Sequence, residues 1–361
     1  MKVGIIDADL LDGGTTVPNL VCMKLSGYYK DCGHDVKLLT DYNSLDFDKI
    51  FIAKVFSKTK VPDGVIDLPH VAYGGTGFFY DKAPNLPDYI EHHHPDYSLY
   101  DDYIKGQIAS GVKPTKFKNY TDFSIGYTTR GCFRKCDFCV NKKYDRVYRH
   151  SPVSEFLDES RKYIMLLDDN VLAFPHWRDV FEELQSTGKR FQFKQGMDIR
   201  LMTEEKARVI ASSKYHDTFI FAFDDYKEKD IIIPRLRMFT QYTSKSPKLY
   251  LFCGFKSQNE KDIAEVFERL FLLWETNSIG YLMRFEKVYG SRWENIYTEL
   301  AAWINQPNFQ KKMSFREFVL ADSKRTKTRK SKKLAVFEDF CKTYPDVAQK
   351  YFDRKLGDKL G

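Results

Sequence analysis

Six apolar, strand-like segments that alternate with segments of helical periodicity constrain the fold of this sequence more than any other feature. They lie at residues 125–128, 163–167, 191–194, 218–223, 248–253 and 280–284. Strands that follow one another at roughly 30-residue intervals, with one helix between them, form parallel sheets with right-handed crossovers. The sequence therefore predicts an α/β fold containing a partial (β/α)6 barrel, whose functional site lies at the carboxyl ends of the strands.

The 361 residues leave room for smaller parts on both sides of this barrel. Over residues 1–80 we expect a small α/β domain of Rossmann or flavodoxin type, with strands at 3–6, 36–39, 50–53 and 71–73. Residues 81–121 are rich in Pro, Asp, His and Tyr, which predicts an irregular linker. The barrel is expected over 122–305, and a helical, basic C-terminal extension over 306–361.

The apolar and cysteine content indicates the cellular compartment. No run of eighteen apolar residues exists, and the N-terminus reads as a first strand, so we expect neither a membrane span nor a signal peptide. The odd number of cysteines, seven, argues against a disulfide framework. We therefore expect a cytoplasmic protein, in which clustered cysteines indicate metal or redox chemistry.

The net charge of +7 is concentrated in one tract, Lys324–Lys333, where seven of ten residues are Lys or Arg. Such a tract either is a solvated linker or binds nucleic acid through its phosphates. The second alternative makes nucleic acid a candidate partner.

Three cysteines form a Cys-x3-Cys-x2-Cys motif at Cys132, Cys136 and Cys139, directly after the first strand of the barrel pattern. Three thiolates on one loop suit an iron–sulfur cluster and leave one of four irons free. Structural zinc requires a fourth ligand, such as the distant His150. Three unrelated cysteines are the remaining alternative, and the position at a strand end favours the cluster.

With the aromatic Phe138 before its last cysteine, this motif resembles the signature of the radical S-adenosylmethionine (radical SAM) superfamily over about residues 121–305. The resemblance implies an enzyme in which the three cysteines hold a 4Fe-4S cluster and SAM binds the fourth iron. An electron from a flavodoxin- or ferredoxin-type reductant then cleaves SAM to a 5′-deoxyadenosyl radical. The substrate is open between nucleic acid, peptide and metabolite; the alternative function is a zinc-stabilised nucleic-acid-binding protein without enzymatic activity.

Polar residues follow the second and third strands of the pattern. Asp168, Asp169 and Asn170 resemble the segment that binds the amino group of SAM, and helix capping is the alternative. After the third strand, Arg200 could pair with the carboxylate of SAM, with Gln195 and Asp198 binding other polar groups; alternatively, Asp198 and Arg200 pair with each other.

The fourth and fifth strands end in further candidates. Asp224 is expected to hold ribose hydroxyls or to lie in a solvated turn, and Gly254 to let the backbone approach adenine. Cys253 could donate a hydrogen atom to a substrate radical, although a buried cysteine is commonly a small hydrophobic residue.

The N-terminal part resembles the cobalamin-type radical SAM architecture. It lacks the Asp-x-His-x-x-Gly motif, which His34 and His70 do not supply, so we expect no cobalamin. His92, His93 and His94 are adjacent and cannot all face one metal ion from a regular element, so we predict no metal site there.

Overall fold

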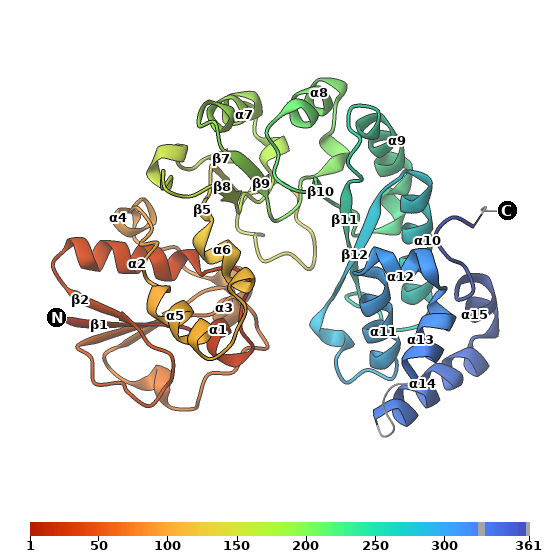
Figure 1. The fold of residues 1–361 in the computed structure, drawn as a ribbon, viewed down its shortest axis with the longest axis horizontal. Helices are drawn as coiled ribbons and strands as arrows, with labels where there is room; N and C mark the ends of the chain where they lie inside the picture. Colours follow the sequence, from red (N-terminus) through yellow and green to blue (C-terminus); the bar gives the residue numbers. More distant parts are fainter. Residues whose placement is uncertain (324–328, 359–361) are drawn as a thin grey trace. The chain divides into compact units, whose positions relative to one another are not determined.

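The computed structural model describes residues 1–323 and 329–358, without the side chains of 322, 323 and 329–332. The chain divides into two compact units, Met1–Gln195 and Gly196–Gly361, and Figure 1 shows the elements of each. The predicted limits of the four domains stay predictions. Half of the basic tract, residues 324–328, lies outside the described residues, and the nucleic-acid role predicted for the tract is untested.

A four-stranded parallel sheet opens the first unit, in the order β2-β1-β3-β4. Its strands are β1 (Lys2–Asp7), β2 (Asp35–Leu38), β3 (Lys49–Ala53) and β4 (Val71–Gly74). Helix α1 (Ala8–Asp12) and the longer α2 (Leu20–Asp31) lie between β1 and β2, and α3 (Thr76–Phe79) follows β4. The predicted N-terminal strands and their parallel arrangement are confirmed.

The segment 81–121 is more regular than predicted. It contains α4 (Asp88–Glu91), α5 (Asp101–Ala109) and α6 (Lys118–Thr121). Ile90 and Ile104 are buried in the same apolar cluster as Met23 of α2 and Ile5 of β1. These short helices therefore belong to the core that covers the N-terminal sheet.

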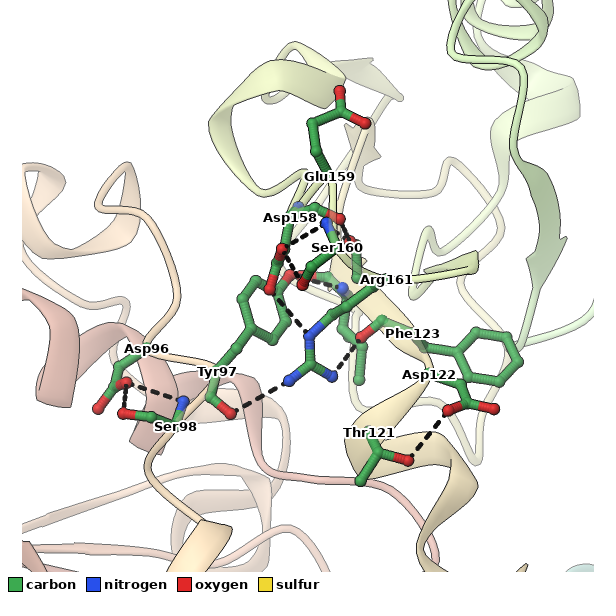
Figure 2. Close-up of polar contacts among 12 residues, drawn as sticks. Asp96, Tyr97, Ser98, Thr121, Asp122, Phe123, Asp158, Glu159, Ser160 and Arg161 are labelled. Carbon is green, nitrogen blue, oxygen red and sulfur yellow. Dashed lines mark hydrogen bonds and ion pairs between the residues drawn. The ribbon is translucent and has the colours of Figure 1, made fainter.

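A buried arginine ties this helical segment to the strands that follow (Figure 2). The Arg161 guanidinium donates hydrogen bonds to the backbone oxygens of Tyr120 (2.5 Å), Phe123 (3.2 Å) and Tyr97 (3.1 Å). The Tyr97 hydroxyl in turn accepts from the Ile125 N–H (2.8 Å). Because a buried charge must be compensated by such contacts, Arg161 fixes the helical segment against strand β5.

All six strands predicted for the barrel are present, as two parallel three-stranded sheets, one in each unit. In the first unit the order is β5 (Phe123–Gly126), β8 (Tyr163–Leu166), β9 (Arg190–Phe193), with helix α7 (Trp177–Ser186) before β9. In the second it is β10 (Ile220–Ala222), β11 (Lys248–Cys253), β12 (Ile279–Arg284), with helices α8 (Glu204–Ser212), α9 (Lys229–Thr240) and α10 (Glu260–Glu275). The α/β class is confirmed, and closure into one six-unit barrel stays a prediction.

The second unit ends in helices, as expected for the C-terminal extension. They are α11 (Glu294–Ile304), α12 (Pro307–Lys312), α13 (Phe315–Ser323), α14 (Arg329–Thr343) and α15 (Pro345–Tyr351). Phe337 and Phe340 of α14 are buried, and the Phe340 ring lies 5.0 Å from the ring of Trp293. Lys333, the described end of the basic tract, pairs with Glu299. None of the helices in 1–323 and 329–358 has the length and hydropathy that a membrane span requires.

Candidate active site

The cysteine loop is closed at its base by a short hairpin. Strand β6 (Thr129–Arg130) pairs antiparallel with β7 (Tyr148–Arg149), and the three cysteines lie between them. Gly131 has φ +95°, and a Cβ there would lie 2.3 Å from the Arg146 carbonyl oxygen. Only glycine fits this position, so the turn that presents Cys132 depends on it.

The half-buried thiols of this loop receive hydrogen bonds. Backbone N–H groups of Arg134 and Asn141 donate to the sulfurs of Cys132 (3.4 Å) and Cys139 (3.3 Å). Donors at sulfur stabilise a thiolate and tune a bound cluster. Burial raises the pKa of the Cys139 thiol, so a bound metal must displace its proton. The Phe138 carbonyl accepts from the Tyr80 hydroxyl (2.7 Å), which anchors the far side of the loop.

The spacing of the sulfurs bears on which metal group the cysteine loop can hold. Among the described residues, one set of three His, Cys, Asp or Glu ligand atoms lies within 4.8 Å of one another, and the cysteines are not in it. Thiolates on one tetrahedral zinc ion lie about 3.8 Å apart, given Zn–S bonds of about 2.3 Å. A four-iron cluster takes each thiolate to a different iron and needs a wider spread. His150, the expected fourth zinc ligand, directs Nε2 to Glu91 (3.2 Å).

Two of the three residues predicted after the second strand hold the loop. The buried Asp168 carboxylate accepts from the backbone N–H and the hydroxyl of both Thr128 and Thr129, at 2.6–3.1 Å. Asp169 accepts from the Gly131 N–H (2.7 Å) and the Asn141 side-chain amide (2.6 Å). Both carboxylates therefore hold the turns on either side of the cysteines, a structural role that differs from helix capping, the alternative to SAM binding in the sequence analysis.

Asn170 is placed differently from these two carboxylates. Its Nδ2 donates to the Cys132 sulfur (3.3 Å), while its buried Oδ1 has no hydrogen-bond partner among the described residues. A buried acceptor without a donor costs about 1–3 kcal/mol. Asn170 thus offers an unused acceptor beside the first cysteine, which an ammonium group would satisfy.

Arg130 also lies at the base of the cysteine loop, and it was not predicted as a site residue. Its guanidinium lies 4.1 Å from the centroid of the Tyr127 ring, and its Nε is 3.7 Å from the Asp169 carboxylate. That buried Nε has no hydrogen-bond partner among the described residues. The only sequence signal was an arginine directly before Gly131 of the motif. Arg130 therefore adds a cationic side chain at the base of the cysteine loop.

The other predicted residues lie at or beyond the end of the first unit. Gln195 is exposed and is the last residue of that unit. In the second unit, Arg200 Nε donates to the buried Asp198 carboxylate (2.6 Å), and its Nη1 contacts Glu228. The structure thus shows the mutual pairing of Asp198 and Arg200 that the sequence left as an alternative.

Asp224, which follows β10, and Cys253 and Gly254, at the end of β11, are the remaining predicted residues of the second unit. The Asp224 Oδ1 is buried without a partner among the described residues, and burial raises the pKa of this carboxyl to about 6 against the opposing effect of Arg269. Gly254 has φ +77°, and a Cβ there would lie 2.1 Å from Val288 Cγ2. The buried Cys253 thiol donates to the Met283 carbonyl (3.5 Å), and burial raises its pKa to about 12. Cys253 therefore keeps the S–H bond that a hydrogen-atom donor needs.

No protein-family model and no curated protein match this sequence. Two solved structures of TsrM from Kitasatospora setae, a radical SAM methyltransferase, are similar in fold. One holds cobalamin and a 4Fe-4S cluster: it is 11% identical, with a TM-score of 0.52 over 78% of this chain and 74% of that chain. The other holds a tryptophan substrate and aza-SAM: it is 11% identical, with a TM-score of 0.51 over 78% and 72%.

The comparison bears on two predictions. TsrM binds cobalamin, so the expectation that this chain binds none receives no support from it. The predicted resemblance to radical SAM enzymes is confirmed at the level of the fold: the chain has an α/β fold with parallel sheets that is similar to that of TsrM.

Proposed function

We propose that this protein is a radical SAM enzyme in which Cys132, Cys136 and Cys139 hold a 4Fe-4S cluster. Such a cluster, when bound, supplies the electron that cleaves SAM to methionine and a 5′-deoxyadenosyl radical. The observation that carries the proposal is Asn170, whose unsatisfied, buried Oδ1 lies on the side chain that contacts the Cys132 sulfur. An acceptor in this position suits the ammonium group of SAM.

The remaining residues of the loop position these groups. Asp168 and Asp169 hold the turns on either side of the cysteines, so neither is assigned to SAM. Arg130 pairs with one carboxylate, Asp169 at 3.7 Å, and its Nε–H makes no hydrogen bond among the described residues. It is therefore a better candidate for the SAM carboxylate than Arg200, which already contacts two carboxylates. Roles in SAM or substrate binding for the other second-unit residues stay predictions.

The surface of the loop supports an acidic electron carrier as the partner, of the flavodoxin or ferredoxin type. Residues 130–149 contain seven Lys or Arg and two acidic residues, and Lys135, Lys143 and Arg146 are exposed. A positive surface accelerates association with an acidic protein, and salt screens the effect. Reduction by such a carrier should therefore slow as the ionic strength rises.

Anaerobic incubation of the reconstituted protein with SAM and a reductant tests the proposal, by measuring 5′-deoxyadenosine and methionine. We expect both products from the wild type and from Cys32→Ala, which removes an exposed thiol outside the motif, and neither from Cys132→Ala. A colourless protein that binds zinc at the cysteines and yields no 5′-deoxyadenosine would instead support the zinc-stabilised alternative.

A further inference from the structure

A second group of metal-ligand side chains lies in the first unit, apart from the cysteines. It comprises His92, directly after α4, His150, directly after β7, and Glu155, at the end of the 3-10 helix Val153–Glu155. One ligand atom of each lies within 4.8 Å of the others, the only such set among the described residues. We propose that these three residues bind a divalent transition-metal ion such as Zn²⁺.

The orientation of the two imidazoles supports this proposal. His92 Nδ1 is 3.1 Å from both Glu155 carboxylate oxygens, and the His92 and His150 rings stack with centroids 4.9 Å apart. Two imidazoles and one carboxylate suit zinc, iron(II), cobalt or nickel rather than magnesium or calcium, which prefer oxygen ligands alone.

The Nε2 atom of each imidazole faces a carboxylate, and metal-bound histidines commonly donate their second ring N–H to such a group. His150 Nε2 is 3.2 Å from Glu91, and His92 Nε2 is 3.7 Å from Asp88. Glu91 also pairs with the buried Lys24, whose Nζ is 3.1 Å from its carboxylate. Glu91 therefore holds the His150 ring through Nε2 and leaves Nδ1 for a metal ion.

The three ligand atoms converge on one hydroxyl. The buried Ser151 Oγ lies 2.5 Å from Glu155 Oε1, 2.7 Å from His150 Nδ1 and 3.5 Å from His92 Nδ1. This hydroxyl is also placed to become a fourth ligand. The prediction of no metal site at 92–94 considered only adjacent histidines, whereas the fold brings the other ligands from residues 150–155.

Zinc binding to the full-length protein, with its cluster installed anaerobically so that the cysteines are occupied, tests the proposal. The measurements are titration calorimetry with Zn²⁺ and the zinc content after dialysis. We expect about one zinc per chain for the wild type, no retained zinc in His92→Ala, and about 10- to 100-fold weaker binding in Glu91→Gln, which alters an outer partner. The matched control is His94→Ala, because the Nδ1 of His94 contacts the Glu155 backbone oxygen (2.9 Å) instead.

Zinc should also raise the melting temperature of the wild type and of His94→Ala but not that of His92→Ala, since ligands stabilise the state that binds them. Circular dichroism of each metal-free variant shows whether it is folded. The site shares no ligand with the cysteine loop, so Cys132→Ala should lose the cluster yet keep the His92-dependent zinc. If the wild type binds no stoichiometric zinc, or if His92→Ala and His94→Ala retain equal zinc, the proposal is wrong and His92, His150 and Glu155 form only a hydrogen-bond network.

Discussion

Replacing Asn170 with the similarly sized Leu should change SAM binding and protein stability in different directions. Asn170 Oδ1 is buried and unpaired, so the protein without ligand carries a desolvation cost of about 1–3 kcal/mol that leucine removes. Leucine also loses the weak hydrogen bond to the Cys132 sulfur (3.3 Å). We therefore expect the free energy of unfolding to stay constant or to rise by about 1 kcal/mol.

SAM binding should weaken in the same variant. A hydrogen bond to a charged group contributes about 1.5–3 kcal/mol, so losing the contact with the ammonium should lower SAM affinity about 10- to 150-fold. Titration calorimetry of the cluster-loaded protein measures this, and urea unfolding measures stability. Asn119→Leu is the control, because its amide donates to the Thr16 carbonyl (2.8 Å) away from the loop. Unchanged SAM affinity in Asn170→Leu would refute the assignment, whatever its stability.

Three further predictions concern the cluster, a buried acid and cobalamin. Cys139→Ala should lose iron and sulfide while Cys22→Ala keeps both; wild-type iron content in the former would contradict the cluster. Because burial raises the pKa of Asp224 to about 6, the folded state binds more protons than the unfolded state between about pH 4 and 6, and stability falls as pH rises through that range. Asp224→Asn should remove this pH dependence. The free energy of unfolding is measured in urea at pH 5 and pH 7, and a difference between the two pH values as large in Asp224→Asn as in the wild type would contradict the prediction. Anaerobic reconstitution with hydroxocobalamin should leave no corrinoid after gel filtration, and a stoichiometric corrinoid spectrum would make methyl transfer the leading reaction.

The strand pattern could be predicted from the sequence because the strands are short runs of apolar residues that alternate with amphipathic helices. Strand β11 coincides with the predicted 248–253, and β8 ends one residue before the predicted 167. Helix α5 was missed because Asp101–Ala109 has a weak apolar stripe and an internal glycine, Gly106. Burial of Ile104 in the apolar cluster that also contains Met23 stabilises the helix, and such tertiary packing overrides a weak helix propensity.

The candidate site was predicted in outline and only partly in its detail. The cysteines could be found because their spacing is local, and Asn170 because it follows a strand end. Arg130 was missed because no pattern in one sequence tells which residue of a two-residue strand turns its charge inward. The same limit hid the group at His92 and His150, whose members are 58 residues apart and are joined only by the fold.

Asp168 and Asp169 show why position at a strand end does not determine a role. A carboxylate there meets backbone N–H groups of the neighbouring turn as readily as it meets a ligand, and both uses place the same residue type at the same point. Asp168 accepts four hydrogen bonds from Thr128 and Thr129, three at Oδ1 and one at Oδ2, so both of its oxygens already have donors. Asn170 has one buried oxygen with none. The number of hydrogen bonds that each oxygen already accepts therefore favours Asn170 as the partner of the SAM ammonium group and gives the two aspartates the role of holding the cysteine loop. Charge alone would have favoured the aspartates as the ammonium partners.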